Sequence, residues 1–194
     1  MIYSIFGFGK MKTEASVGLA IRGIANHDEV LFAQFLKDGS SLEANFLNMF
    51  SNCHVRNTDT KGFTYDKETE KAVNDLYDLV LNAVTNDEVK LVILDEILVC
   101  YDMNYVTYKK LKSLLYTCKE HNIDVCMTGR INSKLKRTNI TILSDIVTNA
   151  YAIKHWFNSY CNECKCEYEY HYKFCPKCGA ELRRSVPPKK GRDY

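Results

Sequence analysis

The sequence predicts a three-layer α/β domain with a mostly parallel sheet, followed by a small cysteine-rich unit. Short apolar runs alternate with longer segments in which apolar residues recur every three or four positions, as they do in helices packed on a sheet. Runs such as Leu91–Leu94 are apolar throughout, which is typical of parallel strands covered on both faces. Five of the nine cysteines lie between positions 161 and 178, so a second unit is expected there.

The expected elements follow from this alternation. We expect strands at 2–6, 30–35, 90–94, 123–127 and 146–152. Helices are expected between them, at 13–25, 41–50, 67–84 and 104–121. Alternating strands and helices form parallel sheets through right-handed crossovers, and ligands of such sheets bind beyond the carboxyl ends of the strands. Residues that directly follow the strands are therefore the first candidates for a site.

The composition limits the classes of function. The chain has 194 residues, of which 46% are apolar, and a formal net charge of +2. This charge gives no reason to expect nucleic acid as a partner. The best apolar run, 91–100, is interrupted by Asp95 and Glu96, so no membrane span is expected. The sequence begins directly with an expected strand, without the features of a leader peptide, and we expect a cytoplasmic protein.

The segment GFGKMKT, residues 7–13, resembles a phosphate-binding loop. It lies between the first expected strand and the first expected helix, where backbone N–H groups and the helix dipole attract an anion. In such a loop Lys12 would contact the terminal phosphates and Thr13 would meet Mg²⁺. The other expected loop contacts are Gly7, Gly9 and Lys10. An α/β domain with this loop is of the P-loop (RecA-like) type.

Charged and polar residues follow two further strands. Asp95 and Glu96 end the strand at 90–94, and two carboxylates opposite a phosphate loop suit Mg²⁺ held directly or through water. Thr128, Gly129 and Arg130 follow the strand at 123–127, and the guanidinium of Arg130 is a good phosphate partner. Acidic residues also punctuate ordinary solvated turns, which is the alternative for the first pair. All three segments are expected at one edge of the sheet.

A polar loop contains two aromatic residues, Phe63 and Tyr65. Aromatic side chains in such a loop either anchor it on the core or present a ring to a flat ligand. The residue pattern alone favours anchoring, because buried aromatic area is the commoner use.

The cysteines near the C-terminus have the spacing of a metal site. Two Cys-x-x-Cys pairs predict a tetrahedral Zn²⁺ with four sulfur ligands, which leaves no open position and therefore serves structure. Cys166 or His171 could replace one ligand. The four predicted ligands are Cys161, Cys164, Cys175 and Cys178. The remaining cysteines, 53, 100, 118 and 126, lie in or beside apolar segments and are expected to be inert packing residues.

These observations predict three parts of the chain. Residues 1–156 form the P-loop domain, with the mostly parallel sheet, and residues 157–184 form a small zinc ribbon. Residues 185–194 contain prolines and basic residues and are expected to be a disordered tail.

Taken together, the motifs resemble the ATP:corrinoid adenosyltransferase family of vitamin B12 assimilation over about residues 2–157. The segments that carry the resemblance, all in the family's order, are Gly7–Thr13, Gly18, Ala20 and Arg22, Gln34–Lys37, Gly62–Tyr65, Leu94–Glu96, Thr128–Arg130, Ser144–Thr148, and Lys154 with His155.

The resemblance implies transfer of the 5′-deoxyadenosyl group from ATP to Co(I) of a corrinoid, with release of triphosphate. It implies that the loop lysines and Thr13 hold the triphosphate, with Arg22 as a further cationic partner. Thr13 and Glu96 would hold Mg²⁺. Phe63 and Tyr65 would exclude the lower axial ligand of cobalt, which reverses the preference for anchoring. A homodimer and an electron-donating flavoprotein partner are also implied.

The sequence departs from the family in the phosphate loop, where Met11 replaces the glycine that lets the backbone approach the phosphates. Two other classes of function stay open. One is a thymidine-kinase-like phosphotransferase, because that family also joins a P-loop domain to a zinc site. The other is a binding module that uses the ribbon and basic tail to hold nucleic acid or protein.

Overall fold

The computed structural model describes residues 1–7, 11–60, 65–150, 159–161, 163–168, 174–175 and 177–184. The chain divides into two compact units, Met1–Tyr151 and Ala152–Tyr194. The strands of the first unit are β1 (Ile2–Phe6), β2 (Val30–Gln34), β3 (Cys53–Asn57), β4 (Leu91–Asp95), β5 (Asp124–Gly129) and β6 (Ile146–Asn149). Its helices are α1 (Lys12–Ala25), α2 (Leu42–Leu47), α3 (Lys67–Thr85), α4 (Ile97–Asp102), α5 (Tyr108–Glu120) and α6 (Lys134–Leu143).

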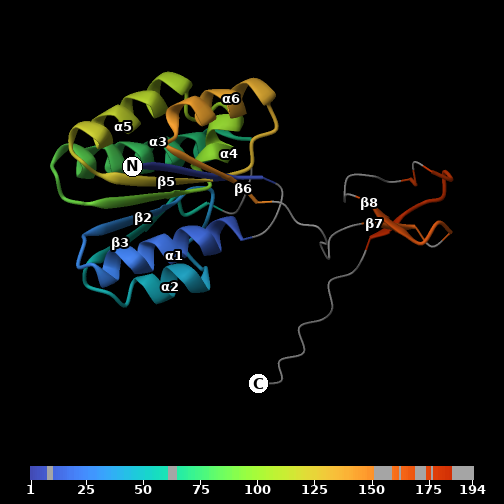
Figure 1. Cartoon of the computed structure of the whole chain (residues 1–194), viewed down its shortest axis with the longest axis horizontal. Helices are drawn as coiled ribbons and strands as arrows, with labels where there is room; N and C mark the ends of the chain where they lie inside the picture. Colours follow the sequence, from blue (N-terminus) through green and yellow to red (C-terminus); the bar gives the residue numbers. More distant parts are fainter. Residues whose placement is uncertain are drawn as a thin grey trace. The chain divides into compact units, whose positions relative to one another are not determined.

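The six strands form one parallel sheet in the order β3-β2-β4-β5-β1-β6. Helices α1 and α2 cover one face, and α3, α4, α5 and α6 cover the other (Figure 1). This arrangement confirms the predicted three-layer α/β fold with a mostly parallel sheet. Within the described parts of the chain, no helix is both long and apolar enough to cross a bilayer.

Each face of the sheet has its own hydrophobic core. Successive residues of a strand point to opposite faces, and in β2 both sets are buried and, apart from the terminal Gln34, apolar. Leu31 and Ala33 pack with α3, α4 and α5. Val30 and Phe32 pack with α1 and α2. The continuous apolar strands of the sequence are thus explained by burial on both sides.

Side-chain caps define where several helices begin. Asp66 accepts a hydrogen bond from the N–H of Thr69 (2.7 Å) at the start of α3. Thr107 accepts from the N–H of Lys110 (3.2 Å) at the start of α5. Such caps satisfy N–H groups that have no partner inside the helix. The expected helix at 104–121 therefore begins four residues later, and α4 is a separate short helix.

Three elements of the first unit were not expected from the sequence, namely the short helix α4, strand β3 and helix α6. Strand β3 lies at the edge of the sheet, and its residues alternate between buried and exposed, so it lacks the continuous apolar run of the inner strands. Helix α6 buries only Ile140 among its described residues, and its apolar side chains Leu135 and Ile142 are exposed. The last expected strand is β6, which ends at Asn149.

The second unit contains a small antiparallel sheet of β7 (Ser159–Cys161), β8 (Cys166–Tyr168) and β9 (Arg183–Arg184), in the order β8-β7-β9. Among its described residues, the buried apolar side chains are those of Cys161, Cys175 and Leu182. The described part of this core is very small, and small units of this kind are usually stabilised by disulfides, metals or oligomerisation.

Candidate functional site

Asp95, the last residue of β4, is the centre of a polar cluster at the carboxyl edge of the sheet. Its side chain is fully buried. One carboxylate oxygen, Oδ1, accepts hydrogen bonds from the hydroxyls of Thr13 (3.0 Å) and Thr128 (2.7 Å). The other, Oδ2, accepts from Nζ of Lys37 (2.6 Å) and Nε2 of Gln34 (3.4 Å). The cluster joins the ends of β2, β4 and β5 to the start of α1.

The order of the strands explains why these side chains meet. Gln34 and Asp95 end neighbouring strands and are paired in the parallel register. Strand β5 lies on the other side of β4, and Thr128 is near its carboxyl end. Strand β1 is next to β5 and leads to α1, so Thr13 in the first turn of that helix reaches the same edge. As expected from the sequence, the segments after β1, β4 and β5 meet at one edge.

The donor atoms of the cluster suit a hard cation. A buried carboxylate is costly unless it is paired and hydrogen-bonded, and Lys37 supplies the opposite charge from a side chain that is 27% exposed. The hydroxyl of Thr13 and the carboxylate of Asp95 offer oxygen ligands of the kind that Mg²⁺ prefers. The residues present therefore fit a magnesium ion at this edge.

Glu96 adds a second carboxylate, surrounded by positive charge. Its backbone is left-handed (φ 64°), and its N–H donates to the hydroxyl of Thr128 (3.0 Å). Burial, followed by the negative charge of the preceding aspartate, raises the pKa of the Glu96 carboxyl above its usual range. Three cationic side chains close by oppose this rise, and they are Lys12, Lys37 and Arg130. The predicted cations Lys12 and Arg130 therefore lie in the electrostatic field of the same carboxylate.

Met11 immediately precedes α1 and adopts a left-handed backbone conformation (φ 81°). Its carbonyl accepts the first hydrogen bond of the helix, from the N–H of Ala15 (3.0 Å). The side chain is 66% exposed, so apolar burial does not hold it in place. A non-glycine residue in this conformation costs about 1–2 kcal/mol. Phe8, Gly9 and Lys10 of the predicted phosphate loop lie outside the described residues.

Two glycines at this edge are required by close packing. A Cβ on Gly7, whose φ is 128°, would lie 2.2 Å from the carbonyl oxygen of Ala150. A Cβ on Gly129, whose φ is 141°, would lie 2.9 Å from Cβ of Leu98. Both positions combine a backbone conformation that favours glycine with a neighbour that leaves no room.

Tyr65 is the described member of the predicted aromatic pair, whereas Phe63 lies outside the described residues. The Tyr65 side chain is 80% exposed, and its ring centroid lies 6.4 Å from that of Tyr105 in a tilted arrangement. The Tyr105 hydroxyl accepts a hydrogen bond from the N–H of Asp66 (3.1 Å). This hydrogen bond fixes the backbone of Asp66, whereas the ring of Tyr65 faces solvent. The Tyr65 ring is therefore not buried in the core.

Arg22 is not brought to this cluster. It lies in the last turn of α1, nine residues and about 14 Å along the helix from Thr13. It lines a surface pocket of about 450 Å³ with Lys90 and Asp124, which lie at the amino ends of β4 and β5. This pocket is at the opposite edge of the sheet from the polar cluster.

Gln34 and Lys37 are cluster residues to which the sequence pattern gave no separate role. Both belong to a segment at the carboxyl end of an expected strand. Ligands of parallel sheets bind beyond these strand ends, so the reasoning that selected Asp95 also applies to Gln34 and Lys37. Lys37 is separated from β2 by Phe35 and Leu36, which are both buried, and a lysine after an apolar run reads as an ordinary surface residue.

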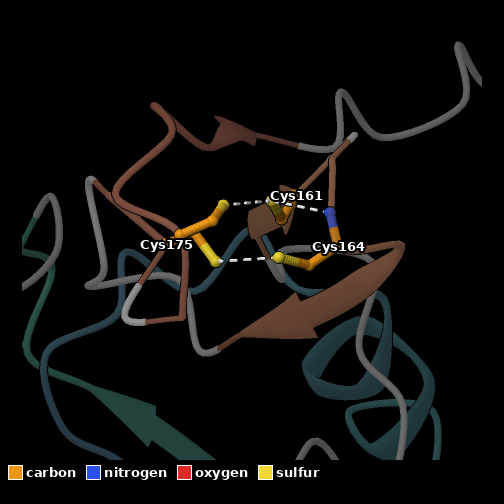
Figure 2. A group of neighbouring side chains, drawn as sticks. Cys161, Cys164 and Cys175 are labelled. Atoms are coloured by element: carbon orange, nitrogen blue, oxygen red, sulfur yellow. Dashed lines mark hydrogen bonds between the residues drawn. The ribbon is translucent and has the colours of Figure 1, made fainter.

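In the second unit, four cysteines form a compact group. Their Sγ atoms all lie within 4.8 Å of one another. The Sγ–Sγ distances are 3.6 Å between Cys161 and Cys178 and 3.9 Å between Cys164 and Cys175. Four sulfurs about 2.3 Å from one tetrahedral ion would be about 3.8 Å apart. Figure 2 shows Cys161, Cys164 and Cys175 turned toward one another.

Backbone N–H groups complete this site. The N–H of Cys164 donates to Sγ of Cys161 (3.3 Å). The N–H of Gly179 donates to the carbonyl of Cys175 (2.8 Å), which closes the turn around the second cysteine pair. Gly179 has a φ of 74°, the left-handed region that glycine adopts at little cost. The cysteine group could hold a metal ion such as zinc.

The four cysteines of the first unit, Cys53, Cys100, Cys118 and Cys126, are buried, as expected for packing residues. Burial raises the pKa of the Cys53 thiol to about 11 and those of Cys118 and Cys126 to about 12. Burial also raises the pKa of Cys100. The reactive thiolate form is therefore disfavoured at all four positions.

A parallel sheet covered on both faces, with a buried carboxylate and two hydroxyls at its carboxyl edge, defines an α/β protein with its candidate site at the strand ends. A family model described as ATP:corrinoid adenosyltransferase BtuR/CobO/CobP matches residues 1–166. The chain therefore belongs to the ATP:corrinoid adenosyltransferase family, which confirms the resemblance seen in the sequence. The comparison with curated proteins gives no match. The matched region ends before Cys175 and Cys178, so the second cysteine pair lies outside it.

Proposed function

We propose that the protein transfers the 5′-deoxyadenosyl group of ATP to Co(I) of a corrinoid. The cobalt electron pair forms the Co–C5′ bond while the C5′–O bond breaks, and triphosphate leaves with the electrons of that bond. The observation that carries the proposal is the buried Asp95 cluster at the strand ends, in a chain whose family has this activity. The family match favours this reaction over a thymidine-kinase-like phosphotransfer.

The leaving triphosphate is the main charge that the protein has to stabilise. We assign its binding to Lys12 and Arg130, whose charges act on the same edge of the sheet, together with the loop residues Gly9 and Lys10. Preorganised cations stabilise the charge that builds up on a leaving group. The Co(I) centre is itself the nucleophile, so alignment rather than general-base catalysis is the task of the site.

Magnesium is assigned to the edge formed by Thr13, Asp95 and Glu96. When bound there, Mg²⁺ would neutralise triphosphate charge. The hydroxyl of Thr13 donates a hydrogen bond to the carboxylate of Asp95 (3.0 Å), so the fold holds these two oxygens side by side. The pairing of Thr13 with Asp95 makes this aspartate a magnesium-site residue beside Glu96, the carboxylate singled out by the resemblance.

For the corrinoid, we propose that Phe63 and Tyr65 exclude the lower axial ligand of cobalt. The exposure of Tyr65 supports this assignment, because the ring is available to a flat ligand. Arg22 is left out of the phosphate site because it lies at the far end of α1. A homodimer, a flavoprotein electron donor and a cytoplasmic location also belong to this proposal.

We also propose that the cysteine group holds a structural Zn²⁺. Four sulfur ligands leave no open coordination position, so this ion would stabilise the unit and take no part in transfer. The sulfur separations of 3.6 and 3.9 Å support a tetrahedral ion. We retain the division into a nucleotide-binding domain at 1–156, a zinc ribbon at 157–184 and a disordered tail at 185–194.

The transfer itself is tested with reduced cobalamin and Mg-ATP under anaerobic conditions. We expect light-sensitive adenosylcobalamin to form with the wild-type protein. We expect Lys12→Ala to reduce the rate at least about a hundredfold, because a cation that would neutralise the leaving triphosphate is lost. Lys109→Ala serves as the control, since Lys109 is an exposed lysine on α5. Equal turnover by wild type and Lys12→Ala would remove Lys12 from the site.

Met11→Gly is expected to tighten Mg-ATP binding several-fold. Glycine removes the Cβ that narrows the approach to phosphates and adopts the left-handed conformation of this residue at little cost. Relief of about 1–2 kcal/mol of strain offsets the greater flexibility of glycine in the unfolded chain, so the melting temperature should change little. Calorimetric titration measures the affinity. Met11→Ala shortens the side chain but keeps Cβ, and an equal gain with alanine would show that bulk, not backbone, limits binding.

A further inference from the structure

The ammonium of Lys37 contacts residues that would hold the proposed magnesium ion. Its Nζ is 2.6 Å from Oδ2 of Asp95 and 3.4 Å from Oγ1 of Thr13. They are two of the three residues that the proposed function assigns to magnesium, so the inference rests on that proposal. One ammonium therefore contacts two of the three groups that would offer oxygen ligands to the ion.

The backbone around Lys37 holds the side chain in this direction. Leu36 is buried and adopts a left-handed conformation (φ 57°), which is unusual for a branched residue. The N–H of Lys37 donates to the hydroxyl of Thr58 (3.3 Å), and this hydroxyl lies 3.3 Å from the carbonyl of Lys37. Thr58 is itself buried. The hydroxyl of Thr58 thus contacts both the N–H and the carbonyl of Lys37 and fixes the backbone from which the side chain reaches Asp95.

Charge balance requires a cation beside Asp95 whether or not a ligand is bound. A fully buried carboxylate without an opposite charge is strongly unfavourable. Lys37 meets this need in the ligand-free protein. A divalent ion on the same oxygens would repel the ammonium and replace its charge, and the lysine stem is flexible enough to let the ammonium turn away.

We infer that Lys37 exchanges places with magnesium. The ammonium neutralises Asp95 in the ligand-free protein, leaves when Mg²⁺ binds with ATP, and then contacts the triphosphate at the same edge of the sheet. Lys37 thus has two roles: it neutralises Asp95 when no metal is bound, and it contacts the leaving triphosphate when the metal is bound.

The test uses Mg²⁺ alone and inorganic triphosphate with Mg²⁺, so it does not depend on adenosyl transfer. Lys37→Met keeps most of the length of the side chain and removes its charge, and Lys109→Met is the matched control. We expect Lys37→Met to lower the melting temperature of the ligand-free protein. We expect Mg²⁺ alone to raise the melting temperature of Lys37→Met more than that of the wild type, because no ammonium competes.

Calorimetric titration with Mg-triphosphate tests the second position of the side chain. Loss of a charged hydrogen bond should weaken binding by Lys37→Met about tenfold, whereas Lys37→Arg should keep most of the affinity. The pair Asp95→Asn and Asp95→Asn/Lys37→Met repeats the comparison without a buried charge, in case Lys37→Met does not fold. This pair is titrated with inorganic triphosphate in the absence of Mg²⁺, because Asp95→Asn removes the carboxylate that would hold the ion. A tenfold difference within this pair supports the triphosphate contact, and equal affinity overturns it.

The outcomes separate this inference from the proposed function. Equal stabilisation of wild type and Lys37→Met by Mg²⁺ would show that the ammonium does not occupy the metal position. Binding of Mg-triphosphate by the wild type with no effect of Lys37 overturns only the role of Lys37. Absence of Mg-triphosphate binding by the wild type overturns the phosphate site itself.

Discussion

Asp95→Asn is expected to reduce adenosyl transfer by about a hundredfold or more. Asparagine keeps the shape of the side chain and one oxygen for Thr13 and Thr128, but it removes the negative charge that would hold Mg²⁺ and pair with Lys37. A bound metal contributes several kcal/mol of charge stabilisation in the transition state, so its loss has a large effect on rate. Turnover measured over a range of Mg²⁺ concentrations checks the prediction.

The control for this substitution is Asp75→Asn, an exposed aspartate on α3. It changes the net charge by the same amount and lies outside the cluster, so its magnesium dependence should match the wild type. If Asp95→Asn kept both the wild-type rate and the wild-type magnesium dependence, the buried carboxylate would have a structural role alone.

Removal of the metal from the cysteine group is expected to unfold the second unit and leave the first unit intact. The described residues of the second unit bury very few apolar side chains, so the sulfur–metal bonds have to supply most of its stability. Structural zinc contributes about 10–16 kcal/mol to the folding of zinc-finger peptides. The first unit has two cores of its own and does not depend on this ion.

Metal analysis and limited proteolysis measure this effect. The purified protein should contain one equivalent of zinc, and a chelator should make residues 152–194 sensitive to protease while residues 1–151 persist. Cys164→Ser should lose the metal, whereas Cys166→Ser should retain it if the four grouped cysteines are the ligands. Zinc loss with Cys166→Ser instead would change the ligand set. A protease-resistant second unit without metal would contradict the prediction.

The inner part of the sheet was predictable because its physical signal is local. Strands such as β4 carry only apolar residues until a carboxylate ends them, and that change marks both the strand end and the site. The meeting of Thr13, Asp95 and Thr128 then follows from the parallel arrangement, in which strand ends share one edge.

The elements that were missed depend on their surroundings. Strand β3 buries only alternate residues, and its place in the sheet comes from pairing with β2, which the sequence of β3 does not display. The contact between Lys37 and Asp95 joins residues far apart in the chain through a left-handed turn at Leu36. Arg22 is close to the phosphate loop in the sequence but lies in the last turn of α1, far from the start of that helix where Thr13 lies.

The sheet also acts as a partition inside the first unit. The side chains that pack under α1 and α2 form one compartment, and those under α3 to α6 form another. Residues in separate compartments share few neighbours, so changes in one are absorbed without repacking the other. Core residues on one face of the sheet can therefore be substituted while those on the other face stay unchanged. The strand ends lie between the two compartments and keep the side chains of the polar cluster in position.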